Sequence, residues 1–188
     1  IRIYADDEYL ACGAKVAEDL ADCDCIFGIK EMPADCFLPQ KTYVFFAHVI
    51  KGQAHNMPML KKLLELGCNL IDYEKITDDH GKRLIFFGHY AGLAGMIDTL
   101  WALGQRLELA GIVSPFSELR PTIHYENLAQ AKQAVLNVGK KIVEQGLHPT
   151  LIPLVCGITG YGNVSRGAQE IFDLLPFQEI EPRNLGKF

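Results

Sequence analysis

The sequence has no run of basic residues, no long apolar stretch and no C-x-x-C pair. Its net charge is −5, which makes nucleic acids and acidic membrane surfaces poor candidates as partners. A membrane-spanning helix needs about 18–20 consecutive apolar residues, and no stretch approaches that length. We therefore expect a protein that binds no nucleic acid and spans no membrane.

The six cysteines are scattered, and the histidines show no spacing typical of metal ligands. We therefore predict no metal site, and buried free thiols in a reducing compartment. Ile1 is followed by polar and acidic residues, so we also expect no signal peptide. These features favour the cytoplasm, or the mitochondrial matrix in a eukaryote.

What the chain does contain is an ordinary globular composition, 49% hydrophobic and 22% charged over 188 residues. Four apolar runs have the length of strands and do not alternate cleanly with polar residues. They cover residues 25–29, 43–47, 69–71 and 84–87. Such runs are typical of strands buried on both faces, so we predict an α/β fold with a parallel sheet covered by helices.

Helical patterns separate and follow these runs. Asn56 is placed to cap a helix that has Pro58 near its first turn and ends at Gly67. A long helix is predicted from residue 88 to about 107. Its early turns are rich in small residues, which would let a neighbouring backbone come close; contact with a ligand is the alternative explanation. These residues are Ala91, Gly92, Ala94 and Gly95.

The flanking segments are read in the same way. Residues 1–24 are predicted to hold a strand remnant followed by a helix with an apolar stripe at Ala14, Val16, Ala17 and Leu20. Residues 111–125 contain the proline breakers Pro115 and Pro121 and are expected to form a loop or a short connector. An amphipathic helix is predicted over residues 127–145, with Gly146 ending it.

A glycine-rich turn near the C-terminus gives the clearest functional signal. An apolar run over residues 151–155 leads into it, and residues at helical spacing follow it. Gly160 and Gly162 match the first two glycines of G-x-G-x-x-G, while Ser165 stands where the third is expected. With Glu181 ending a second predicted strand at 177–181, the pattern predicts dinucleotide binding. A tight turn without a ligand is the alternative.

These elements suggest two domains. Residues 1–100 would form a substrate-binding and catalytic α/β domain, cut at its N-terminus. Residues 101–188 would supply crossing helices and part of a Rossmann-like NAD(P)-binding domain. Such a domain needs at least βαβαβ, so we expect the chain to be part of a longer enzyme.

Ligands of open α/β sheets bind at the carboxyl ends of the strands. Lys30, His48 and Glu74 follow three of the predicted strands, and Arg83 enters the fourth. Lysine and histidine can act together as an acid–base pair, and arginine can bind a carboxylate with two hydrogen bonds. The alternatives are a solvated lysine and a half-buried structural histidine.

Several motifs in the same order resemble the lysine–2-oxoglutarate reductase/saccharopine dehydrogenase family, within the wider alanine dehydrogenase and transhydrogenase group. The reductase part of the aminoadipic semialdehyde synthases is the most similar branch, because of Gly-Asn-Val-Ser and the later Glu181-Pro182. The motifs are Gly28-Ile29-Lys30-Glu31-Met32-Pro33, Phe46-Ala47-His48, Ile71-Asp72-Tyr73-Glu74, Phe87-Gly88-His89-Tyr90-Ala91-Gly92 and Thr159-Gly160-Tyr161-Gly162-Asn163-Val164-Ser165.

The resemblance implies reductive condensation of lysine with 2-oxoglutarate to saccharopine, or the reverse, with NADP or NAD as cofactor. It implies that Lys30 and His48 form the acid–base pair. Substrate would be bound or its charge tuned by Lys51, Gln53, Glu74, Arg83 and Phe87. Cofactor would be bound by Lys82, Gly157, Gly160, Tyr161, Gly162, Asn163 and Glu181.

Two departures from the family pattern matter. The N-terminal arginine-bearing segment and the rest of the nucleotide domain are missing from the sequence, so the chain alone is expected to bind cofactor weakly and turn over poorly. Glu181 suits a free ribose 2′-hydroxyl, whereas Arg183 suits a 2′-phosphate, and the family branch favours NADP. A fused or associated saccharopine dehydrogenase domain is also implied. The competing functions are an alanine dehydrogenase-like enzyme and a non-catalytic dinucleotide-sensing module.

Overall fold

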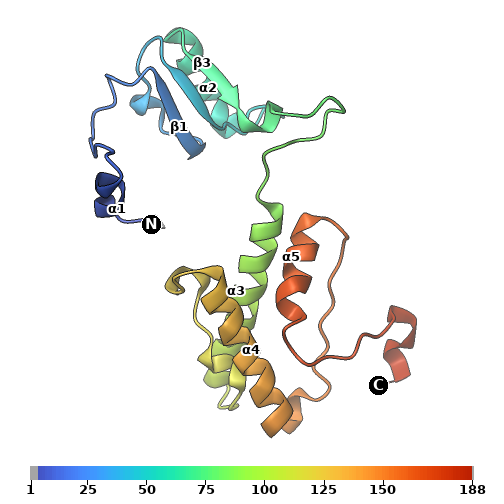
Figure 1. Ribbon diagram of the computed structural model, residues 1–188. Coiled ribbons are helices and arrows are strands. Elements are labelled where there is room, and N and C mark those ends of the chain that lie inside the picture. The colour runs from blue at the N-terminus through green and yellow to red at the C-terminus, as the bar shows by residue number, and fades with distance from the viewer. Residues whose placement is uncertain (1–3, 188) are drawn as a thin grey trace. The chain divides into compact units, whose positions relative to one another are not determined.

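The computed structural model describes residues 4–187, which divide into two units between Phe86 and Phe87 (Figure 1). The N-terminal unit contains all of the strands found in the described residues. Its helices are α1 (Asp6–Ala11) and α2 (Met57–Glu65), and its strands are β1 (Cys25–Lys30), β2 (Thr42–Phe46) and β3 (Asn69–Asp72). The C-terminal unit is helical, with α3 (Gly88–Leu109), α4 (Leu128–Gln145) and α5 (Asn163–Phe172).

Short 3₁₀ turns connect these elements. In the N-terminal unit they are η1 (Ala34–Cys36), η2 (Ala54–Asn56) and η3 (Tyr73–Lys75). In the C-terminal unit they are η4 (Pro115–Glu118), η5 (Thr122–His124), η6 (Pro149–Leu151) and η7 (Pro182–Lys187). The turns η4 and η5 lie in the segment 111–125, which was expected to be a loop or a short connector.

The sheet of the N-terminal unit has the order β1-β2-β3, and both pairs are parallel. Helix α2 connects β2 to β3, as the sequence pattern predicts. The register of β1 against β2 becomes irregular between Phe27 and Lys30. This arrangement confirms the predicted α/β class with a parallel sheet.

The sheet buries one face more completely than the other. Aromatic residues of β2 pack with α2 and η1 in a core formed by Ile26, Phe37, Tyr43, Phe45, Ala47, Met59 and Leu63. In β1, however, Phe27 and Ile29 are 71% and 72% exposed. Burial of the strands on both faces was therefore predicted correctly for β2 and wrongly for the two edge strands, since Ile71 of β3 is also 45% exposed.

Some predicted elements are absent from the part of the chain that the structure describes. Residues 84–87, 151–155 and 177–181 are not strands. A strand needs a neighbour to pair with, and Pro153 removes one hydrogen-bond donor from the second of these runs. Residues 14–20 are not helical either; the N-terminal helix is α1, and the predicted strand remnant falls partly on residues 1–3, outside the described residues.

The core of the C-terminal unit lies among α3, α4 and α5. It includes Leu93, Ile97, Leu100, Phe116, Val135, Val138 and Ile171. Glu170 on α5 pairs with His89 on α3 and Lys132 on α4. Lys132, which donates to the carboxylate, holds the pKa of Glu170 below its ordinary value, and His89 adds to this effect. The three helices are therefore joined by these contacts of the Glu170 carboxylate as well as by apolar packing.

Helices α3 and α5 approach each other at two glycines. A Cβ on Gly92 would lie 2.0 Å from the carbonyl oxygen of Val164, and one on Gly167 would lie 2.1 Å from that of His89. A Cβ on Gly95 would meet nothing within 4 Å. Close packing, the explanation preferred from the sequence, therefore applies to Gly92 and not to Gly95.

Three general predictions can be compared with the described residues. No helix there is long and apolar enough to cross a membrane. No group of three histidine, cysteine or acidic side chains in residues 4–187 could hold a metal ion. The cysteines are free, as expected, but the prediction that they are buried is wrong, because Cys68 is half-buried and the others are exposed.

Candidate functional site

The candidate site lies at the carboxyl edge of the sheet. Lys30 is the last residue of β1, and His48 follows β2 by two residues. Glu74 lies in η3, directly after β3. Because the three strands are parallel, these positions share one edge. The sequence argument depended on this parallel arrangement.

His48 is held against an acidic partner. Its Nδ1 lies 2.8 Å from Oε2 of Glu31, and both side chains are 37% exposed. The ring also stacks on Phe46, with centroids 6.1 Å apart. An ionised carboxylate can only accept a hydrogen bond, so Nδ1 carries the proton in this contact and Nε2 is the ring nitrogen that does not take part in it.

The charge on Glu31 is favoured by its surroundings. A backbone hydrogen bond at Glu31 and the hydrogen bond with His48 hold the pKa of this carboxyl below its ordinary value, and the charge of Lys30 contributes to the same effect. Lys30 itself is exposed. Lys30, Glu31 and His48 therefore form one electrostatic group at the sheet edge, although the described residues show no hydrogen bond between Lys30 and His48.

Glu74 and Arg83 form a second pair in the same unit. Arg83 Nη2 lies 2.7 Å from Glu74 Oε1, with the side chains 47% and 11% exposed. The backbone of Arg83 forms an antiparallel bridge with Thr77, and Asp78 accepts hydrogen bonds within the turn between them. A short turn, not the predicted fourth strand, therefore presents Arg83 next to Glu74.

The remaining candidates of the N-terminal unit are positioned by local turns. Gln53 uses its Oε1 to accept a hydrogen bond from the backbone N–H of Lys51, at 3.0 Å. Lys82 is exposed, and its N–H donates to Asp78 Oδ1 at 2.8 Å. The roles of Lys51, Gln53 and Lys82 toward substrate and cofactor stay predictions.

Most candidates of the C-terminal unit lie just before a helix, either α3 or α5. Phe87 precedes α3 and is partly exposed. The glycine-rich turn leads into α5, which begins at Asn163, with Tyr161 93% exposed before it. A Cβ on Gly157, Gly160 or Gly162 would meet nothing within 4 Å, so the space beside the turn is open. The first-turn N–H groups of a helix lack intrahelical partners and can bind a phosphate, so pyrophosphate binding at this turn stays a prediction.

Two details of this region differ from the sequence argument. Ser165, at the position of the third motif glycine, is buried and accepts a hydrogen bond from Gln169. Gly167 provides the close helix packing instead. Glu181 and Arg183, the two candidates for the ribose, pair with each other at 2.6 Å.

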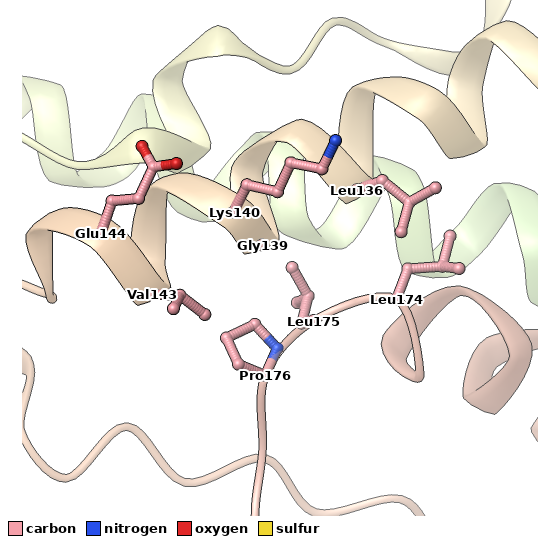
Figure 2. A pocket seen from close by; sticks show the side chains of 8 residues that line it. All are labelled: Leu136, Gly139, Lys140, Val143, Glu144, Leu174, Leu175 and Pro176. Atoms are coloured by element: carbon pink, nitrogen blue, oxygen red, sulfur yellow. The ribbon is translucent and has the colours of Figure 1, made fainter.

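An apolar groove of about 330 Å³ lies elsewhere in the C-terminal unit, between α4 and the segment after α5 (Figure 2). Figure 2 shows Lys140 and Glu144 on α4 above Leu175 and Pro176. None of the candidate residues lines it. The groove therefore adds nothing to the candidate site.

The sequence argument missed the roles of Glu31 and Asn56. Glu31 was part of a quoted motif but received no role; its position next to Lys30 was the available signal. Asn56 was expected to cap α2, yet its side chain makes no cap hydrogen bond. It donates instead to the carbonyl oxygens of Ala47 and His48. No local sequence pattern predicts this contact.

Comparison with known proteins agrees with the resemblance found in the sequence. The chain is 48% identical to alpha-aminoadipic semialdehyde synthase of Arabidopsis thaliana over 184 residues, which is 98% of this chain and 17% of that protein. It is 44% identical to the mitochondrial alpha-aminoadipic semialdehyde synthase of Rattus norvegicus, over 98% of this chain and 20% of that protein. The chain thus spans a fifth or less of these relatives.

A smaller relative shows the same relationship. Saccharopine dehydrogenase [NAD(+), L-lysine-forming] of Emericella nidulans is 32% identical over 178 residues, which is 90% of this chain and 45% of that protein. Residues 1–94 match the family described as alanine dehydrogenase/PNT, N-terminal domain. That match covers half of the chain, including Lys30, His48, Glu74 and Arg83. The chain therefore belongs to the alanine dehydrogenase/PNT N-terminal domain family.

Proposed function

We propose that the full-length protein carrying this chain is an NAD(P)-dependent oxidoreductase that condenses lysine with 2-oxoglutarate to saccharopine, or runs the reverse reaction. The observation that carries the proposal is the pairing of His48 with Glu31 at the carboxyl edge of a parallel sheet, in a chain 48% identical to an aminoadipic semialdehyde synthase. A pyridine nucleotide is the cofactor we infer, and it would supply the hydride when bound.

In this proposal the site performs proton transfers. The ε-amine of lysine adds to the ketone of 2-oxoglutarate, and water then leaves to give an imine. His48 Nε2 would accept the proton that the amine loses, and Lys30 would protonate the departing hydroxyl. The Glu31 carboxylate would favour the charged imidazolium formed in the first step.

The remaining candidates would bind the reactants. Arg83 would contact a substrate carboxylate, while Glu74, Lys51, Gln53 and Phe87 would complete the substrate site. The open space beside Gly160 and Gly162 would receive the pyrophosphate. The cofactor would also contact Lys82, Gly157, Tyr161, Asn163 and Glu181. We infer NADP as the preferred form, and association or fusion with a saccharopine dehydrogenase domain.

The relatives also support a proposal for location. Several of the aminoadipic semialdehyde synthases are named as mitochondrial proteins. We propose the mitochondrial matrix if the protein comes from a eukaryote, and the cytoplasm otherwise.

The test is NADPH oxidation by the full-length protein with lysine and 2-oxoglutarate together, with each omitted in turn and NADH compared. We expect consumption that requires both substrates. Oxidation with pyruvate and ammonia instead would favour the alanine dehydrogenase-like alternative, which the family match makes the second candidate. Cofactor binding without turnover on either substrate pair would leave a dinucleotide-sensing module.

A further inference from the structure

His48 adopts a backbone conformation that is uncommon for a non-glycine residue. Its φ is +50°, in the left-handed region, where the Cβ of a non-glycine residue is crowded. Such a conformation persists only where surrounding contacts hold it. His48 is also the residue whose imidazole pairs with Glu31. The contacts around its backbone therefore bear on where the ring lies.

Asn56 supplies the first of these contacts. This side chain is buried, and its Nδ2 donates to the carbonyl oxygen of Ala47 at 3.1 Å and to that of His48 at 3.3 Å. Asn56 stands at the N-cap position of α2, where asparagine ordinarily accepts from a backbone N–H, but it makes no such bond. The Asn56 amide therefore binds the backbone carbonyls of Ala47 and His48 and does not cap α2.

Asp72 supplies the second. It is buried at the end of β3, and its Oδ1 accepts from the N–H of Ala47 at 3.4 Å and from the N–H of Glu74 at 2.9 Å. Its Oδ2 is buried and has no hydrogen-bond partner among the described residues. A buried carboxylate with one unpaired oxygen is costly. Asp72 therefore connects the backbone of Ala47 to that of Glu74 while one of its own oxygens stays unpaired.

We propose that Asn56 and Asp72 are positioning residues for the reaction. They hold the backbone of Ala47 and His48, and this backbone places the His48 imidazole at the carboxyl edge of the sheet. This inference rests on the proposed function, because it gives His48 a catalytic role. Asp72 also accepts a hydrogen bond from the N–H of Glu74. The same buried side chain therefore holds the backbone next to His48 and the backbone of Glu74. A purely structural role would instead make Asn56 important only for folding.

A double-mutant cycle in the full-length enzyme separates these roles. The variants are Asn56→Ala, His48→Gln and the double variant, assayed with lysine, 2-oxoglutarate and NADPH. We expect Asn56→Ala to lower kcat at least tenfold while the KM of each substrate changes less than threefold. In the His48→Gln background the same substitution should lower kcat less than threefold further, because the group it positions is gone.

Asn69→Ala is the matched control. Asn69 is an exposed asparagine at the amino end of β3, and it donates to Thr42 Oγ1 at 3.3 Å. It should leave kcat within twofold. If Asn56→Ala does not fold, Asn56→Ser, which keeps one donor, is carried through the same cycle.

Two results would overturn the inference. One is a folded Asn56→Ala enzyme with kcat within twofold of the original. The other is an equal loss of kcat from Asn56→Ala in both backgrounds. A His48→Gln enzyme with unchanged kcat would be a different result, because it would refute the catalytic role of His48 on which this inference rests. The proposed reaction itself would fail only if the unaltered enzyme showed no NADPH oxidation that requires both substrates.

Discussion

Nδ1 of His48 lies 2.8 Å from Oε2 of Glu31, across the irregular end of the β1–β2 pair. Because an ionised carboxylate can only accept a hydrogen bond, Nδ1 carries the proton in this contact, and we propose Nε2 as the nitrogen that exchanges a proton with the substrate. The contact connects Glu31, the neighbour of Lys30 in the chain, to His48, which the sequence analysis proposed as a member of the acid–base pair. Glu31, to which the sequence analysis gave no role, is therefore the hydrogen-bond partner of His48.

Replacing Glu31 with glutamine should reduce turnover modestly. Glutamine keeps the shape but removes the charge that favours the imidazolium. Both side chains are more than one-third exposed, so the pair is worth about 1 kcal/mol at most, which corresponds to roughly a fivefold change in rate. We expect kcat of the full-length enzyme to fall about two- to fivefold. An unchanged kcat would show that the contact does not assist His48.

The same pair should make stability depend on pH. Because the folded pKa of Glu31 is lowered, its stabilising contribution is complete above the ordinary glutamate pKa of about 4.3 and is lost as pH falls through the lowered value. Urea unfolding followed by circular dichroism would compare the original protein with Glu31→Gln. The difference between their unfolding midpoints should be constant near neutral pH and should shrink in acid. A difference that grows in acid would contradict the assignment.

The parallel core of the N-terminal unit could be predicted because each strand is a local apolar run. Residues 84–87 have the same composition but form no strand, and only Arg83, just before them, bridges to Thr77. A strand is completed by its neighbour, and a local run carries no information about whether that neighbour is present. The strand predicted over residues 151–155 is absent for the same reason.

The positions of the candidate site could be predicted further than its contacts. Lys30 and His48 share an edge simply because their strands are parallel. The contact between His48 and Glu31 depends on the irregular end of β1 and on a positive φ at His48. Both result from tertiary packing, as does the turn of the Asn56 side chain away from its own helix. Propensities and periodicity describe none of these.

The crossing of α3 and α5 predicts opposite effects for two glycines on one helix. A Cβ on Gly92 would overlap the backbone of Val164 and Ala168, and overpacking of this kind costs about 1–3 kcal/mol or more. Gly95→Ala is the matched control, since its Cβ would meet open space and alanine is favoured over glycine in a helix by about 1 kcal/mol. Chemical unfolding should show a lower midpoint for Gly92→Ala and an equal or higher one for Gly95→Ala. Equal midpoints for the two variants would contradict the packing.

Removing the Arg83 guanidinium should weaken the binding of one substrate. A charge-assisted hydrogen bond to a carboxylate is worth about 1.5–3 kcal/mol, so Arg83→Gln should raise the KM of either lysine or 2-oxoglutarate by roughly 10- to 100-fold, with a smaller change for the other. Arg120→Gln serves as a control, because Arg120 lies over the Tyr125 ring in the C-terminal unit. If neither KM rises, Arg83 acts only as the partner of Glu74.

Lys30 and His48 should both be needed for proton transfer. General acid–base groups typically contribute about 10²–10⁴-fold, so Lys30→Met and His48→Gln should each lower kcat of the full-length enzyme by that range while NADPH still binds. Lys61→Met is a matched control, because Lys61 is an exposed lysine of the same unit that pairs with Glu65 on its own helix. A loss below tenfold for both site variants would refute the acid–base assignment. A large loss for His48→Gln alone would instead leave His48 as the single acid–base group, with Lys30 acting through its charge on Glu31.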